Sequence, residues 1–453
     1  MVRDMTKGKP VPVIIRFCLP VLLGCLLQQS YNLADIAIIG RFVGMDEMGA
    51  VSATGSLNFL VIGFVLGLTN GFCIPIAQTF GAGDVPEMRR YAANAFYLCG
   101  MFAVGLTALT MVFTRPLLEF MNTPPETIES AYSYIIVLFG GITAIILYNV
   151  FAGLLRALGD SKTPLYFLII SCVISVVLDL VFILGFNMGT AGAGWATVIA
   201  QIFSVILCAV YLRKNYPVLL FKKGELKFSR ERCLKLIANG VPMALQFSIT
   251  AIGSVILQSA VNGLGKVAVS AVGMASKIQV FLMQPMETLG ITMATFCAQN
   301  LGAGKLRRVK KGIKLGMIMV LIYSVAAGLL VIFAGRYMAM IFVSENEENL
   351  SEALNYVSRL LAANGSLYCV LGVLFIIRNS VQGLGYGMVT MLAGVSELVA
   401  RAGVASLVTV YGFNAVCFAN PAAWILADLM LIVIFAVLMK KLSKIPRKEL
   451  GRK

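Results

Sequence analysis

Long uninterrupted apolar runs, such as residues 134–146 and 317–333, constrain this chain more than any other feature. A membrane-spanning helix needs about 20 consecutive apolar residues, whereas a strand of a membrane barrel alternates apolar and polar side chains. These runs do not alternate. Hydrophobic residues make up 59% of the 453 positions and charged residues only 13%, too few polar groups to cover a water-soluble surface. The sequence therefore predicts an all-α polytopic membrane protein.

Twelve spans account for the apolar runs. We expect them at residues 13–40, 51–77, 91–113, 129–153, 164–186, 192–212, 236–262, 270–298, 313–335, 353–381, 388–411 and 421–440. Most of the 37 Lys and Arg then fall in alternate connections, and the opposite connections keep only Arg41, Arg115, Lys266 and Arg336. This asymmetry is typical of the positive-inside rule and predicts that both termini are cytoplasmic. The net charge of +16 therefore sets topology and contacts anionic lipid, and no nucleic acid is needed.

The two halves of the chain share short strings in the same order. Ala-Val-Ser-Ala-x-Gly occurs at 50–55 and 268–273, and Ala-Gln-x-x-Gly-Ala-Gly occurs at 77–83 and 298–304. Leu-Gly follows at 158–159 and 384–385. Basic residues follow both Gly-Ala-Gly strings, so both face the same side and the repeats are parallel. The prediction is two parallel six-helix bundles around a central cavity, an architecture of alternating-access transporters.

This repeat divides the chain into four predicted parts. They are an N-terminal lobe (1–212), a basic cytoplasmic linker (213–235), a C-terminal lobe (236–440) and a basic cytoplasmic tail (441–453).

An ionisable side chain at membrane depth costs roughly 2.5–3.5 kcal/mol on insertion scales, so each one calls for an explanation. The first expected span carries Asp35 together with Gln28, Tyr31 and Asn32. The spacing of Gln28, Asn32 and Asp35 places them on one helix face. No Lys or Arg on that span is positioned to neutralise Asp35. Such a carboxylate tends to hold a proton or to bind Na⁺ with nearby oxygens.

Asp179 is the second carboxylate of the first half, one turn after Ser175 on the fifth span. Asn149 and Thr197 add neutral oxygens from the fourth and sixth spans. We therefore expect a cation-coupling site built from these four residues and Asp35, with the two aspartates as candidate Na⁺ ligands. The sequence contains no histidine, so proton transfer falls to carboxylates. The alternative is that these groups only hydrogen-bond helices together.

The second half does not copy this site. Aligning Pro20 with Pro242 puts Leu257 at the place of Asp35. We expect the substrate cavity to be lined by Gln28, Tyr31, Asn32, Gln246, Glu287 and Arg378. Glu397 and Arg401, at positions i and i+4 of one span, are expected to form an ion pair, which Arg378 either joins or leaves to line the cavity. Asp428 receives no predicted role.

Several strings resemble the multidrug and toxin extrusion (MATE) transporters. They are Asn-Leu-Ala-Asp at 32–35, Gly-Arg-Phe-Val-Gly at 40–44, the Gln-to-Gly strings at 78–83 and 299–304, Arg-Ala-Leu-Gly-Asp-Ser-Lys-Thr-Pro at 156–164, and Leu-Asp at 178–179 with Ala-Gly-Ala-Gly-Trp-Ala-Thr at 191–197. Details of the second half resemble a bacterial branch of multidrug exporters. The resemblance implies two six-helix lobes and export of organic, often cationic, compounds in exchange for H⁺ or Na⁺.

The same resemblance implies roles for individual residues. Asp35 would be central to cation coupling, and Asp179, Asn149 and Thr197 match family positions. Ser175 stands where many members have an asparagine, a difference that bears on Na⁺ coordination more than on proton binding.

The sequence as a whole predicts an antiporter of the cell membrane rather than an enzyme. H⁺ or Na⁺ is its coupling ion, no further cofactor is expected, and a monomer suffices because both lobes lie in one chain. The alternative is a lipid-linked oligosaccharide flippase of the related superfamily. A flippase is expected to present several arginines to a pyrophosphate, and this chain offers Arg378 and Arg401.

Overall fold

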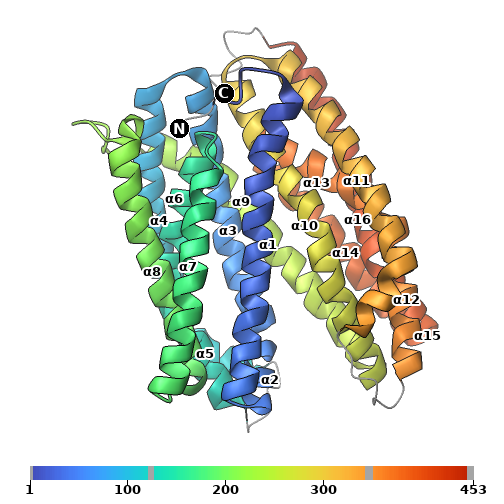
Figure 1. The fold of residues 1–453 in the computed structure, drawn as a ribbon. Coiled ribbons are helices and arrows are strands. Elements are labelled where there is room, and N and C mark those ends of the chain that lie inside the picture. Colours follow the sequence, from blue (N-terminus) through green and yellow to red (C-terminus); the bar gives the residue numbers. More distant parts are fainter. Residues whose placement is uncertain (1–3, 121–126, 342–349, 446–453) are drawn as a thin grey trace. The chain divides into compact units, whose positions relative to one another are not determined.

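The computed structural model describes residues 4–120, 127–341 and 350–445, and the regular structure of these residues is helical (Figure 1). The first half contains α1 (Pro10–Phe42), α2 (Met45–Ala53), α3 (Gly55–Ala82), α4 (Val85–Phe120), α5 (Ile128–Gly140), α6 (Ile142–Ala157), α7 (Lys162–Leu180), the π-helix η1 (Val181–Gly185) and α8 (Gly189–Asn215). A short 3₁₀ turn, η2 (Pro217–Leu219), precedes the second half. The second half contains α9 (Arg230–Asn262), α10 (Lys266–Gly302), α11 (Leu306–Met340), α12 (Leu350–Ser366), α13 (Tyr368–Gly383), α14 (Gly387–Ser406), α15 (Val408–Tyr411) and α16 (Phe413–Ser443).

The predicted twelve-span membrane protein is confirmed. Ten helical stretches of the described chain are long and apolar enough to cross a membrane, and two bent helix pairs bring the number to twelve. Each expected span coincides with one stretch or one bent pair. Large apolar side chains also lie exposed on the outside of the helices, as at Val104 (72% exposed) and Phe333 (75%). Lipid can cover such side chains, but water cannot do so without cost.

The two bent pairs were not predicted. The α5–α6 pair bends by 49° at Gly141, and the α12–α13 pair bends by 51° at Leu367. The two breaks occupy equivalent positions when the repeats are aligned on Gly159 and Gly385. A Cβ at Gly141 would lie 2.4 Å from Val198 Cγ2, so a side chain is excluded there by the close approach of α8. The bend is therefore part of the repeated architecture.

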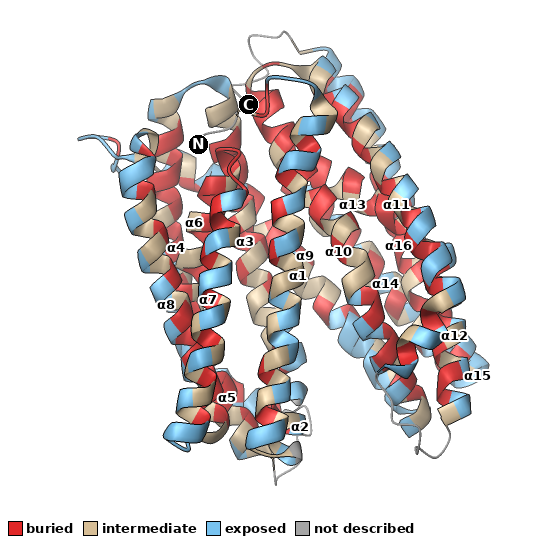
Figure 2. Cartoon of the chain, in the orientation of Figure 1, coloured by how far each residue is buried: buried red, intermediate tan, exposed pale blue. Residues whose placement is uncertain are grey.

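The described chain divides into two compact units. Unit 1 comprises residues 4 and 19–244, and unit 2 comprises residues 5–18 and 245–445. Helix α1 therefore begins in unit 2 and continues in unit 1, while α9 begins in unit 1 and continues in unit 2. Within each unit, buried residues face the neighbouring helices and exposed ones face outward (Figure 2).

The basic stretch expected as a linker, residues 213–235, is packed against α4 within unit 1. Arg232 makes two bonds to Glu87, of 2.7 and 2.9 Å, and Arg89 Nε donates to the Val218 carbonyl at 2.7 Å. The start of the chain is held in the same manner within unit 2, where Arg308 donates to the carbonyls of Met5, Lys7 and Gly8. Of the basic tail, residues 446–453 lie outside the described part.

The Arg-Ala-Leu-Gly-Asp-Ser-Lys-Thr-Pro string forms the turn between α6 and α7. Gly159 adopts a left-handed conformation (φ 81°), which glycine accepts without strain. Asp160 accepts hydrogen bonds from the backbone N–H groups of Lys162 and Thr163, and from the Thr163 and Tyr216 hydroxyls. Burial opposes ionisation here, but these hydrogen bonds outweigh it and hold the pKa of Asp160 below its ordinary value. This carboxylate therefore fixes the start of α7, which carries Asp179.

Candidate functional site

Asp35 lies on the buried side of α1 and is only 5% exposed. Tyr134 of α5 donates its hydroxyl to Asp35 Oδ2 at 3.3 Å. The other oxygen, Oδ1, has no hydrogen-bond partner among the described residues. An ionised carboxylate in this position is incompletely compensated, because burial removes the water that would otherwise bind it.

Asp179 of α7 is fully buried, and within the described chain neither of its oxygens has a hydrogen-bond partner. Its charge interacts with that of Asp35. Neither aspartate belongs to an ion pair in the described part of unit 1. Two buried carboxylates within electrostatic reach keep their charges only when a cation neutralises them. This pair is therefore the strongest candidate for reversible cation binding in unit 1.

Hydroxyl groups connect the helices beside these aspartates. The Tyr31 hydroxyl is 2.8 Å from Ser175 Oγ and 2.8 Å from Thr197 Oγ1, so it links α1 to α7 and α8. Three of the predicted residues thus form one hydrogen-bonded group. Asp35 and Asp179 both act electrostatically on Tyr31. These hydroxyls lie within electrostatic reach of the two carboxylates, and neutral oxygens suit H⁺ or a hard cation such as Na⁺.

Other predicted residues lie outside this group. Asn149 donates its side-chain N–H to the Ile145 carbonyl of its own helix at 2.8 Å. Gln28 and Asn32 are exposed on α1, so the structure does not bring them into the buried group with Asp35. Tyr134, by contrast, was missed by the sequence analysis. It begins an apolar run, and its only signal was a hydroxyl at membrane depth.

Unit 2 contains a polar group of a different kind. Glu397 of α14 is buried between two guanidinium groups, with Arg378 Nη1 at 3.1 Å and Arg401 Nη2 at 3.2 Å. Arg401 also donates to Asn420 Oδ1 of α16 at 3.2 Å. The predicted pair of Glu397 and Arg401 is confirmed, and Arg378 joins it. Here the protein itself compensates the negative charge of Glu397.

Two further membrane-depth carboxylates of unit 2 lie within electrostatic reach of Arg378. The charge of Arg378 acts on Glu287 of α10 and on Asp428 of α16. Gln246 belongs to a neutral network, in which its Oε1 accepts from Gln382 Nε2 at 2.8 Å. Glu287 and Asp428 thus feel the charge of a guanidinium group without forming an ion pair in the described structure, and Asp428 Oδ1 has no hydrogen-bond partner there.

The described residues do not form a metal site with several protein ligands. No group of three or more His, Cys, Asp or Glu among them is placed to hold a metal ion.

Comparison with known proteins defines the class. The fold is that of a polytopic membrane protein built from two repeats. The family model described as MatE matches residues 20–181 and again residues 242–407. The two matches begin at Pro20 and Pro242, the pair of prolines that the sequence repeat aligns. The chain belongs to the MatE family, and is therefore a multi-pass membrane transporter rather than an enzyme.

Individual relatives and a solved structure are also similar to this chain. The chain is 31% identical over 393 residues to "Probable multidrug resistance protein YoeA" of Bacillus subtilis, covering 84% of each protein. It is 22% identical over 391 residues to a "FAD transporter" of Shewanella oneidensis, covering 85% of each. A crystal structure of "MATE in the straight conformation" is similar in fold, with a TM-score of 0.89, 20% identity, and coverage of 98% of this chain and 99% of that one.

Proposed function

We propose that this protein is a secondary active antiporter that exports organic, cationic compounds in exchange for H⁺ or Na⁺ by alternating access. The observation that carries the proposal is the pair Asp35 and Asp179, buried without a basic partner in the described part of unit 1. The multidrug names of relatives such as YoeA support the substrate class.

The coupling follows from the charge of this pair. When a cation binds, the negative charge of Asp35 and Asp179 is neutralised, and the packing of α1, α5 and α7 no longer has to accommodate it. Tyr134 donates to the ionised form of Asp35, while a protonated Asp35 can itself donate. Ion and substrate must favour different conformational states, and the free energy that couples them is reciprocal.

H⁺ and Na⁺ make different demands on the oxygen atoms of this site. Na⁺ needs several oxygen ligands, and here they would come from Asp35, Asp179 and the hydroxyls of Tyr31, Ser175 and Thr197. H⁺ needs only one carboxylate. Both ions remain within the proposal, and the experiment below separates them.

Substrate contact is proposed for two kinds of residue. Gln28 and Asn32 are exposed polar groups on α1, and Glu287 is a half-buried acid on α10 that can attract a cation. Arg378 and Arg401 are both engaged by Glu397. This engagement argues against the lipid-linked oligosaccharide flippase, whose pyrophosphate would need free guanidinium groups.

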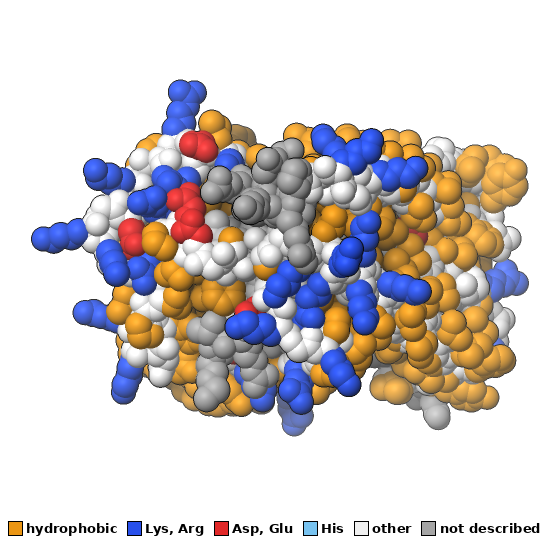
Figure 3. All heavy atoms as spheres, turned by 90° about the horizontal axis from the view of Figure 1, so that it is seen from above, with side chains coloured by type: hydrophobic (Ala, Val, Ile, Leu, Met, Phe, Trp, Pro, Cys, Tyr) orange, Lys and Arg blue, Asp and Glu red, His pale blue; other side chains and the backbone are white. Residues whose placement is uncertain are grey.

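The setting is proposed to be the cell membrane, with both termini cytoplasmic and a monomer as the working form. Figure 3 shows many Lys and Arg side chains at one end of the helices, with a smaller number of acidic side chains among them. We propose that this end faces the cytoplasm and contacts anionic lipid.

The test is efflux of a fluorescent organic cation from liposomes that contain the purified protein. A pH gradient and a Na⁺ gradient are imposed separately, with Asp35→Asn as the test variant and Asp46→Asn, at an exposed acid on α2, as the control. The proposal expects transport under one gradient, its loss in the Asp35 variant and its retention in the control. Transport of FAD or of a lipid-linked sugar in place of the cation would overturn the substrate class.

A further inference from the structure

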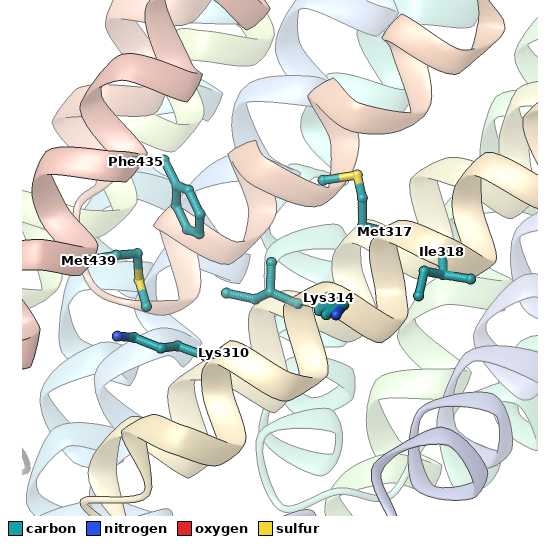
Figure 4. Close-up of a pocket in the computed structure, with 7 residues that line it drawn as sticks. Lys310, Lys314, Met317, Ile318, Phe435 and Met439 are labelled. Carbon is teal, nitrogen blue, oxygen red and sulfur yellow. The ribbon is translucent and has the colours of Figure 1, made fainter.

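A groove lies at one end of unit 2, between the first turns of α11 and the last turns of α16 (Figure 4). Its volume is about 420 Å³, within the roughly 300–1,000 Å³ of small-molecule sites. Its lining includes Lys310, Lys314, Met317, Ile318, Phe435 and Met439. None of these residues belongs to the polar groups of the candidate functional site.

The walls of the groove are apolar. Met317 and Ile318 come from α11, and Phe435 and Met439 come from α16. Met439 is buried, whereas Ile318 is 45% exposed, so the groove opens onto the outer surface of the unit. A surface of this kind, on a helix that crosses the membrane, meets acyl chains rather than water.

The end of the groove is strongly basic. Lys310 and Lys314 lie one turn apart on α11, and Lys310 Nζ donates to Ser443 Oγ of α16 at 2.8 Å. Lys311, Lys440, Lys441 and Lys444 are exposed nearby in the same helix ends. Among the residues that the structure describes, none of these six lysines forms an ion pair with a carboxylate. These lysines therefore favour the binding of an anion at this end of the groove.

We propose that the groove binds one anionic phospholipid. One acyl chain lies against Met317, Ile318, Phe435 and Met439, and the headgroup phosphate is held by Lys310 and Lys314. Both lysines reach the headgroup on flexible apolar stems, a common arrangement at membrane interfaces. The lipid would bridge α11 and α16, as the bond from Lys310 to Ser443 already does. The proposal does not depend on the transported substrate or on the coupling ion.

The charge of the groove favours an anionic phospholipid over other ligands. An organic cation would be repelled by the lysines, and a zwitterionic lipid would gain less from them than an anionic one. Free phosphate would be attracted to the lysines but would leave the apolar walls uncovered. The combination of a lysine pair and an apolar groove is matched by a molecule that carries both a phosphate and an acyl chain.

Native mass spectrometry of the purified protein tests this proposal by titration with phosphatidylglycerol and, separately, with phosphatidylcholine. The test variant is Lys310→Gln with Lys314→Gln. The control, Lys222→Gln with Lys223→Gln, removes the same charge from exposed positions outside the groove. A lysine near a lipid surface contributes about fivefold to affinity, so the test variant is expected to weaken the tightest phosphatidylglycerol binding roughly 30-fold.

A second variant tests the apolar part. Met317→Trp fills the groove without changing charge, and is expected to weaken phosphatidylglycerol binding while thermal unfolding shows a folded protein. Inorganic phosphate at millimolar concentration should not displace the lipid. The proposal is overturned if the lysine variant behaves like its control, if phosphatidylcholine binds equally well, if Met317→Trp leaves binding unchanged, or if phosphate alone competes.

Discussion

The two repeats place very different charges on equivalent helices. When they are aligned on Gly159 and Gly385, Ser171 and Ser175 of α7 correspond to Glu397 and Arg401 of α14. Asp179 corresponds to Ala405. The second repeat therefore holds an acid and a base of opposite charge, bonded at 3.2 Å, where the first holds two hydroxyls.

The two repeats share their architecture but differ in the charges that their helices carry. Both repeats keep the helix order and the break near the middle of a span, at Gly141 and Leu367. In the described structure, Glu397 of the second repeat forms ion pairs with two guanidinium groups, whereas Asp35 and Asp179 of the first repeat form none. A carboxylate that is paired with arginines inside the protein stays ionised and paired. A carboxylate without such a partner can bind and release a cation as the ion gradient changes.

Loss of the Glu397 carboxylate should lower the free energy of unfolding more than any other change considered below. Glu397→Gln leaves the buried Arg401 and the half-buried Arg378 without their shared carboxylate. Breaking a buried pair on one side costs about 3 kcal/mol of unfolding free energy. Asp179→Asn removes a carboxylate that has no partner in the described structure, so it should not destabilise the protein. Denaturation in detergent measures both, and equal losses of stability would erase the contrast between the repeats.

A smaller loss of stability is expected from a substitution at Gly141, where α5 and α6 meet. Gly141→Ala places a Cβ against Val198, and overpacking of this kind costs roughly 1–3 kcal/mol. Leu367→Ala, at the equivalent break, should leave the bend intact because no close approach requires a small residue there. The double variant Gly141→Ala with Val198→Ala should recover part of the lost stability. If it recovers none, steric contact with α8 is not the reason for the glycine.

A smaller effect is expected at the donor to Asp35. Tyr134→Phe removes the hydroxyl bonded to Asp35 Oδ2, and a hydrogen bond to a charged group is worth about 1.5 kcal/mol or more. Gradient-driven efflux should therefore fall about tenfold. Tyr132→Phe, two positions earlier on α5, serves as the control. Unchanged efflux in the Tyr134 variant would show that this bond has no part in coupling.

A modest loss of stability is expected at the turn before α7, where Asp160 of the first repeat corresponds to Tyr386 of the second. The pKa of Asp160 is lowered on folding, so its contribution to stability is present above its unfolded value of about 3.9 and is lost as pH falls through the folded value. Asp160→Asn should cost about 1 kcal/mol near neutral pH. The difference from wild type should vanish in acid, as unfolding measured across pH would show.

The sequence predicts the helices of this protein better than it predicts which side chains contact one another. Helix length, repeat and the membrane depth of Asp35 and Asp179 follow from local composition and spacing. The partner of Asp35, Tyr134, comes from another helix, and no local pattern indicates which residue will face it. Gln28 and Asn32 share the predicted face with Asp35 yet are exposed, because the neighbouring helices decide how much of a face is covered. The bend at Gly141 likewise depends on contact with α8.

The most direct test of the central claim is ion release on substrate binding. The purified protein is mixed with an organic cation in weakly buffered solution, and released H⁺ and Na⁺ are measured for wild type, for Asp35→Asn with Asp179→Asn, and for Asp46→Asn. We expect wild type and the Asp46 variant to release one of these ions as the substrate binds, and the double variant to release none. Undiminished release from the double variant would contradict the assignment of the coupling site to Asp35 and Asp179.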